Sequence, residues 1–313
     1  MDTPPDDSKF VHTFEGAGSC PHCRFVLPRL VECAPVFFEK GCVTCTHCGN
    51  GVELWQAALD HATRLSQVAP WALESLGAAK TSVVMQMETG KYYEIQLTDH
   101  GAPPDAKILN VNCSSQGGEH GSVIPLEWKG NNRSPRFVGT ILRMVAIPLG
   151  EGPVPRVGRV AMSVVWIRGE DSDAWPYLAT AFEAAAAREF APSMVFAQSA
   201  VEISMMPLIE SKFSLYVPEK KVKRFTNYSR ALNVILPYLC GEAGLPQMPT
   251  AVHDALESLR DRRNAVIHKG AKVAAVTPEN AMEGLCAAAF GFEYVRYVRP
   301  ILLEGKNDTA NST

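Results

Sequence analysis

The chain has 313 residues, 46% of them hydrophobic, and a formal net charge of −3 at pH 7. This length and composition predict two or three domains with apolar cores, and the small negative charge excludes a general attraction to nucleic acid, so that any RNA contact must come from a local patch. No run of about 18 apolar residues occurs, and the polar, acidic start of the chain lacks a secretory pattern, so we expect a cytoplasmic protein that does not cross a membrane.

Most of the nine cysteines lie near the start of the chain. In a reducing compartment they indicate metal ligands or free thiols rather than disulfides. A CxxC pair at Cys20 and Cys23 is followed about 20 residues later by a second pair at Cys45 and Cys48. Two such pairs are typical of a zinc ribbon. We therefore expect residues 16–50 to hold one structural Zn²⁺ ion between four thiolates.

Other residues of this segment leave an alternative ligand open. Cys42 is an alternative to one member of the second pair, but Gly49 favours the pair as assigned, because glycine suits the tight turn of a zinc knuckle. Cys33 is predicted to be a packing thiol. His22 and His47 lie inside the two pairs, and we expect them to be exposed side chains rather than ligands.

The middle of the chain changes its hydrophobic period. Residues 51–80 have helical spacing and predict a helical connector. From residue 81 the period is two, which predicts strands, with Thr89-Gly90 as a hairpin turn. Short strands separated by loops rich in Gly, Pro and Asn favour a small antiparallel sandwich or barrel over residues 81–170, which we interpret as a binding or sensor domain. The predicted strands span residues 83–87, 92–97, 108–112, 123–128, 138–147 and 160–167.

The remainder of the chain is predicted to be nearly all helix, as an all-α domain over residues 171–304. Pro192 is expected to interrupt one helix, and Pro237 to bend or end another. We expect the tail at residues 305–313 and the leader at residues 1–15 to be flexible. The whole is thus predicted to be a multidomain α+β protein. Its predicted C-terminal helices span residues 181–188, 193–210, 226–239, 250–269 and 278–303.

The fourth of these helices ends in an unusual set of polar side chains. Val266 and Ile267 continue its apolar stripe, and Arg263 falls in the middle of that stripe. A guanidinium in apolar surroundings is unfavourable unless it meets a carboxylate, a phosphate or another chain. Asn264 and His268 lie one turn apart on a neighbouring face. An Arg, an Asn and a His therefore share the end of one helix.

The pattern Arg263-Asn264-x-x-x-His268 near a helix end resembles the signature of the HEPN superfamily, and the order of helices over residues 174–303 is similar as well. The resemblance implies a compact helical bundle that dimerises, with the two motif helices meeting at a shared cleft. Many members are endoribonucleases that need no metal for catalysis. They use the ribose 2′-OH as the nucleophile and leave a cyclic phosphate, often as bacterial toxins or antiviral effectors.

The resemblance also implies roles for particular residues. His268 would act as general acid or base, Arg263 would stabilise the charge that develops on the phosphate, and Asn264 would position His268 or the phosphate. Glu202 lies where many members carry an acidic residue, and it is the candidate partner of Arg263. A basic run before the third helix is either a solvated face or a set of RNA contacts. It comprises Lys220, Lys221, Lys223 and Arg224.

An ideal helix places Arg263 and His268 about 140° apart, so either the last helical turn loosens or the pair is completed across a two-fold axis. We interpret the chain as a homodimeric endoribonuclease that cuts single-stranded RNA, with N-terminal parts that sense, recruit or restrain. Such a protein fits a bacterial defence or toxin role, with an antitoxin or defence-system protein as a further partner. The alternative is a non-catalytic HEPN-like scaffold whose ribbon contacts nucleic acid or a protein. A DNA-binding regulator is disfavoured because the chain has no basic excess.

Overall fold

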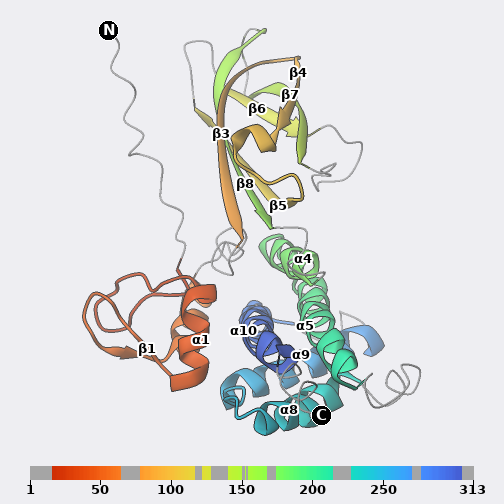
Figure 1. Ribbon diagram of the computed structural model, residues 1–313. Helices are drawn as coiled ribbons and strands as arrows, with labels where there is room; N and C mark the ends of the chain where they lie inside the picture. Colours follow the sequence, from red (N-terminus) through yellow and green to blue (C-terminus); the bar gives the residue numbers. More distant parts are fainter. Residues whose placement is uncertain are drawn as a thin grey trace, which may run out of the picture.

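The computed structural model describes residues 16–64, 78–116, 122–127, 140–149, 152, 154–167, 174–213, 227–269 and 276–304. The described residues form a cysteine-rich part, a pair of small antiparallel sheets and a set of packed helices (Figure 1). The predicted mixture of helices and antiparallel strands is confirmed. The expected leader, the tail and the basic run at residues 220–224 lie outside the described residues.

The cysteine-rich part contains a helix that the expected zinc ribbon lacks. α1 (Leu30–Lys40) lies between the two CxxC pairs, and the short strands β1 (Val43–Thr44) and β2 (Gly51–Val52) pair antiparallel around the second one. The chain then enters α2 (Leu54–Arg64). α1 ends at Gly41, whose φ of 74° is the left-handed conformation that suits a helix C-cap. The signal for α1 is present in the sequence as a stripe of buried residues at helical spacing: Leu30, Cys33, Ala34, Phe37 and Phe38.

In the central part, the described residues form six strands. They are β3 (Ala79–Glu88), β4 (Tyr92–Gln96), β5 (Lys107–Gln116), β6 (Ser122–Glu127), β7 (Ile141–Leu149) and β8 (Val157–Ile167). A 3₁₀ turn, η2 (Leu97–His100), follows β4. The strands pair antiparallel as two sheets, in the orders β3-β8-β5 and β4-β7-β6. Each predicted strand therefore exists, with bounds that differ by a few residues.

The turn at Thr89-Gly90 does not close a hairpin, so that prediction is wrong. β3 pairs with β8 and β4 pairs with β7, and the turn carries the chain from one sheet to the other. Gly90 has a φ of 82°, and its N–H donates to the Ala146 carbonyl of β7 at 2.8 Å. This bond directs the chain toward β7 instead of back along β3.

The two sheets share one hydrophobic core. Alternate residues of the strands point inward, as the period of two predicts. The described strand pairs form two sheets and do not close into a barrel. The core is contributed mainly by Val83, Met87, Ile95, Leu142, Met144, Ala146, Val160, Met162 and Val164.

The helical part follows the predicted order with two corrections. α5 begins at Phe190, so Pro192 lies in its first turn, where a missing N–H breaks no helical bond. The helix expected over residues 226–239 is divided by a π-helical turn, and Pro237 lies in the first turn of α8 rather than ending a helix. The elements are α4 (Trp175–Ala186), α5 (Phe190–Phe213), α7 (Tyr228–Arg230), η3 (Ala231–Ile235), α8 (Leu236–Glu242), α9 (Thr250–Lys269) and α10 (Pro278–Glu304).

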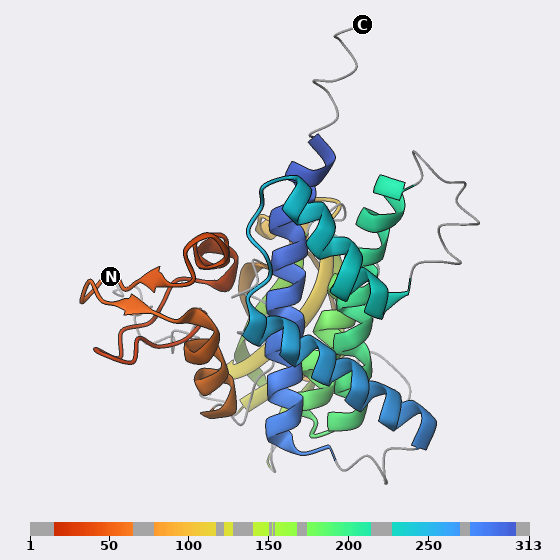
Figure 2. The ribbon, with the colours of Figure 1, turned by 90° about the horizontal axis from the view of Figure 1, so that it is seen from below.

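α10 is the central helix, and Figure 2 shows it surrounded by the other elements. Residues 284–295 are buried without interruption because α10 packs against α1, α2, α4, α5 and α9. Two glycines permit the close approach of α9. A Cβ at Gly284 would come within 3.0 Å of a Leu259 methyl, and one at Gly291 equally close to a Leu256 methyl.

Aromatic rings join the cysteine-rich part to α10. Phe37 of α1 meets Phe290 edge to face at 5.8 Å, and Trp55 of α2 meets the same ring at 5.3 Å. Phe38 meets Tyr294 edge to face at 5.1 Å. Among the described residues, the cysteine-rich part and the helices therefore belong to one continuous hydrophobic core.

A carboxyl group is buried in this core. Glu293 of α10 is only 3% exposed, and its Oε1 lies 3.6 Å from Arg296 Nη1. Burial raises the pKa of Glu293 from an ordinary value near 4.5 to about 7, although the charge of Arg296 opposes the shift. Between about pH 4.5 and pH 7, Glu293 therefore keeps its proton in the native state, whereas the same carboxyl group is ionised in the unfolded chain.

We predict that stability falls as the pH rises from about 4.5 to about 7, because the native state binds more protons than the unfolded state across that window. Glu293→Gln removes the ionisation and should flatten this dependence, with a gain on the order of 3 kcal/mol above pH 7.5. Thermal and urea unfolding of both proteins between pH 5 and pH 8 measures the effect. An unchanged pH dependence in the variant contradicts the assignment.

Candidate metal centre and helical motif

Four cysteine side chains converge between the two CxxC turns. Cys20 Sγ lies 3.7 Å from Cys48 Sγ, and Cys23 Sγ lies 3.7 Å from Cys45 Sγ. All four sulfur atoms lie within 4.8 Å of one another. Tetrahedral zinc with Zn–S bonds near 2.3 Å places its sulfurs about 3.8 Å apart. The donor set and its spacing therefore fit a zinc ion, and they are too open for disulfides, whose S–S bonds are near 2.05 Å.

The two knuckles have the same backbone geometry. The first knuckle comprises residues 20–26 and the second comprises residues 45–50. The N–H of Arg24 donates to the Cys20 carbonyl, and that of Gly49 donates to the Cys45 carbonyl, each at 2.9 Å. Both donors are left-handed, with φ of 64° and 74°. Glycine adopts this conformation without strain, which supports the choice of the second pair, whereas Arg24 adopts it at a steric disadvantage.

Backbone donors favour the thiolate form of Cys45, one of the four cysteines of this cluster. Hydrogen bonds from the backbone N–H groups of Cys48 and His47 lower the pKa of Cys45 to about 6. The Asn50 side-chain amide also donates to Cys48 Sγ at 3.4 Å. Zinc binds thiolates rather than thiols, so these donors favour the metal-bound form.

The remaining residues of this part lie where the sequence placed them. Cys42 is exposed and outside the cluster. Cys33 is buried and donates to the Arg29 carbonyl at 3.2 Å, and burial raises its pKa to about 12. His22 and His47 are both exposed and belong to no ligand cluster among the described residues.

The C-terminal end of α9 extends beyond the packed helices (Figure 2). The apolar stripe is buried through Leu259, and none of the residues from there to His268 is buried. Val266 is half-buried and Ile267 is 49% exposed, so the expected stripe is wrong at Ile267. The last turns of α9 thus carry polar motif residues and unpacked apolar side chains together.

Two arginines on α9 are paired with carboxylates. Arg260 Nη1 lies 2.8 Å from Glu257 Oε2, and Arg262 Nη1 lies 2.7 Å from Glu283 Oε2 of α10. Both arginines therefore have structural roles within the chain.

Arg263 differs from these two neighbours. Its Nη1 donates to Asn264 Oδ1 at 3.0 Å, its buried Nε has no hydrogen-bond partner, and no carboxylate pairs with it among the described residues. His268 is exposed, and no hydrogen bond or ion pair joins it to Arg263 within the described chain. The structure therefore brings Arg263 and Asn264 together and leaves His268 separate from them.

Glu202 does not form the expected ion pair with Arg263 in the described residues. It lies instead near Tyr228 of α7. Burial, followed by the charges of Glu257 and Glu202, raises the pKa of the Tyr228 hydroxyl. Glu202 thus contributes to a polar region between α5, α7 and α9. On α9 this region includes Glu257 and Arg260, which precede Arg263 in the chain.

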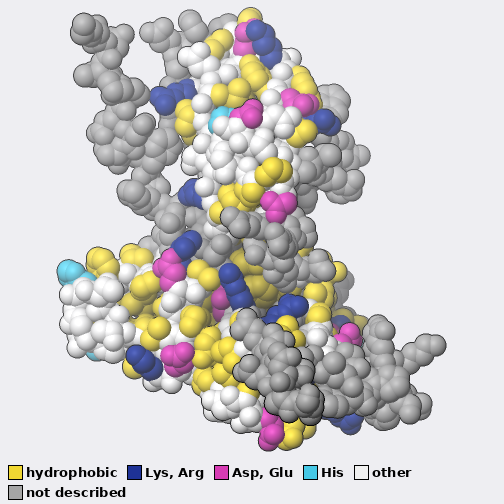
Figure 3. All heavy atoms as spheres, viewed as in Figure 1, with side chains coloured by type: hydrophobic (Ala, Val, Ile, Leu, Met, Phe, Trp, Pro, Cys, Tyr) yellow, Lys and Arg dark blue, Asp and Glu magenta, His cyan; other side chains and the backbone are white. Residues whose placement is uncertain are grey.

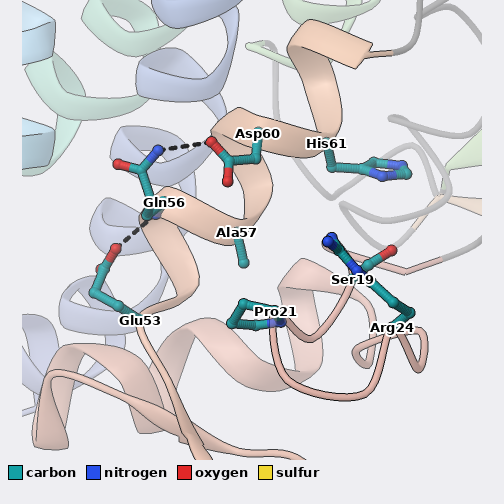
Figure 4. A pocket seen from close by; sticks show the side chains of 8 residues that line it. All are labelled: Ser19, Pro21, Arg24, Glu53, Gln56, Ala57, Asp60 and His61. Carbon is teal, nitrogen blue, oxygen red and sulfur yellow. Dashed lines mark hydrogen bonds between the residues drawn. The ribbon is translucent and has the colours of Figure 1, made fainter.

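A shallow cavity of about 160 Å³ lies between the first knuckle and α2 (Figure 4). Asp60 turns toward Gln56, whose amide donates to it at 2.7 Å, while His61 points the other way. The polar groups do not converge on one position, so the cavity does not define a ligand site. It is lined by Ser19, Pro21, Arg24, Glu53, Gln56, Ala57, Asp60 and His61.

Comparison with known proteins finds no matching family model, no matching curated protein and no matching solved structure. In the described part of the chain, no helix combines the length and the apolar character needed to cross a membrane.

We predict that the purified protein contains one zinc ion per chain and that Cys45→Ser abolishes zinc retention. Because the metal-binding part shares its core with α10, the variant should also lower the melting temperature, on the order of 10 °C. Elemental analysis and thermal unfolding measure both effects.

Cys42→Ser is the matched control, since this exposed thiol lies three residues from Cys45 and outside the cluster. It should keep both the zinc and the melting temperature of the wild type. Loss of zinc in this control would contradict the ligand assignment.

Proposed function

We propose that the protein is a homodimeric endoribonuclease that cuts single-stranded RNA at Arg263, Asn264 and His268, with zinc in a structural role. The observation that carries the proposal is the state of Arg263, which has no carboxylate partner among the described residues, whereas Arg260 and Arg262 each have one. A guanidinium held by a neutral amide keeps its charge available for a phosphate.

The chemistry follows from the three side chains. His268, exposed at the helix end, takes the proton of the ribose 2′-OH or gives one to the leaving 5′-oxygen. Arg263 stabilises the negative charge on the phosphate in the transition state. Asn264 holds the Arg263 guanidinium through its Oδ1. The reaction leaves a 2′,3′-cyclic phosphate and needs no metal at this site.

Dimerisation supplies the geometry that one chain lacks. Arg263 and His268 point about 140° apart on an ideal helix, so a second copy of α9 brings an arginine and a histidine to one phosphate. The projecting end of α9 supports this arrangement, because Val266 and Ile267 gain burial only against another chain or a segment outside the described residues.

The biological setting of the proposal rests on the resemblance to the HEPN superfamily. We propose a role in the cytoplasm as a bacterial antiviral-defence or toxin effector, restrained by an antitoxin, by a defence-system protein or by the sheets of the same chain. In a second candidate function, the dimer is a non-catalytic binding scaffold. The shared core of the cysteine-rich part and α10 favours it, because such rigid fusion suits the presentation of a binding surface.

We predict that the protein cleaves single-stranded RNA in EDTA and that His268→Ala lowers the rate about 10²-fold to 10⁴-fold, the usual contribution of a general acid or base. The exposed position of His268 predicts an unchanged melting temperature. His100→Ala, at an exposed histidine of η2, is the control and should cut like the wild type. Equal cleavage by wild type and His268→Ala would mean that a contaminating nuclease is responsible.

We further predict complementation between two inactive chains. A heterodimer of Arg263→Ala and His268→Ala, purified by two different tags, has one intact composite site and should show about half the wild-type activity per dimer. Each homodimer should be inactive. If the heterodimer is also inactive, the site does not combine Arg263 of one chain with His268 of the other.

A further inference from the structure

The tips of the two knuckles present a pair of stacked rings to solvent. Phe25 of the first knuckle and His47 of the second lie with ring centroids 5.0 Å apart and planes inclined by 10°. Phe25 is 47% exposed, and His47 is exposed as well. If the Phe25 ring served only to cover the sulfur cluster, most of its surface would be buried. Its exposed surface is therefore available to a ligand.

The metal centre holds this pair in place. Phe25 follows Cys23 by two residues, and His47 lies between Cys45 and Cys48. The Phe25 carbonyl accepts the Cys20 N–H at 2.8 Å, which fixes its backbone to the first knuckle. The rings therefore meet because both knuckles are bound to one cluster, and they form a preorganised surface.

The charge of the knuckles suits a polyanion more than a basic or neutral partner. Residues 20–26 and 45–50 contain Arg24 as well as two histidines, and no Asp or Glu. In Figure 3 the outer end of the cysteine-rich part, on the left, displays histidine, hydrophobic and uncharged atoms. Behind this surface, the Asn50 amide donates to Cys48 Sγ at 3.4 Å.

We propose that the Phe25–His47 pair is a stacking platform for the bases of single-stranded nucleic acid, with Arg24, the residue before Phe25, as the cation for a phosphate. A base stacks on a flat exposed ring whatever its sequence, and aromatic stacking is a major source of affinity in such sites. Exposed large apolar side chains in the two knuckles are limited to Phe25 and Val26, an area too small for a stable protein interface. The inference deepens the proposed function, since it states how the RNA is held away from the cutting residues.

Binding is tested in the His268→Ala background, so that cleavage does not interfere. The probe is a fluorescein-labelled 12-nucleotide RNA of mixed sequence, followed by fluorescence anisotropy. Phe25→Ala should weaken binding about 5-fold to 150-fold, the loss of one stacked base. Phe25→Trp should retain it. A DNA 12-mer of the same sequence should bind similarly, because stacking does not require the 2′-OH.

Val36→Ala is the matched control, because Val36 is a comparably exposed apolar residue (40%) on α1 outside the knuckles. It should bind RNA unchanged, and all variants should keep one zinc per chain. Phe25→Ala binding as tightly as this control overturns the inference. So does Phe25→Leu binding like the parent protein, because that result indicates a general apolar contact, such as a protein-docking surface. If the protein binds RNA through Phe25 but the wild type does not cleave it, this inference holds and the proposed endoribonuclease function is wrong.

Discussion

The burial of α10 on all sides is the constraint on which the helical part and the cysteine-rich part both depend. Its ring contacts with α1 and α2 make the segment around the four cysteines part of the main core. A small cysteine cluster usually requires metal because it has too little core of its own. A metal ion bound by the four cysteines would fix the two knuckles, the knuckles position α1 and α2, and these helices complete the core around α10. Metal binding would then be coupled to the stability of the helices.

The same packing explains why the end of α9 is available for chemistry. The buried face of α9 that packs on α10 ends at Leu259, where Gly284 leaves room for it, and none of the described α9 residues beyond that point is buried. Arg260 and Arg262 are held by Glu257 and Glu283. Within the described part of the chain, Arg263 is held by the Asn264 amide and by no carboxylate. The account of function depends on this difference, since a buried ion pair would have neutralised the charge that a phosphate requires.

Much of the fold could be predicted from local sequence signals. The period of two in the strands, the bounds of α9 and the grouping of the two CxxC pairs all follow from local spacing. The apolar stripe of α1 also indicates a helix, but the cysteine pairs on either side favour a zinc ribbon without one. The pairing of β3 with β8 could not be predicted, because it depends on contacts between residues about 80 positions apart in the chain. Locally, a turn such as Thr89-Gly90 fits a hairpin as well as it fits a crossing from one sheet to the other.

The site shows the same division between local and long-range information. The positions of Arg263, Asn264 and His268 on one helix follow from spacing, whereas the absence of an ion pair to Glu202 depends on how α5 and α9 pack. The stacked Phe25–His47 pair needed the closed cluster to bring two distant residues together. The most direct measurement is a crystal structure of the purified protein at its solution oligomeric state. The account predicts a two-fold dimer in which Arg263 of each protomer and His268 of its partner line one cleft, and imidazoles facing solvent on unrelated sides of the assembly would contradict it.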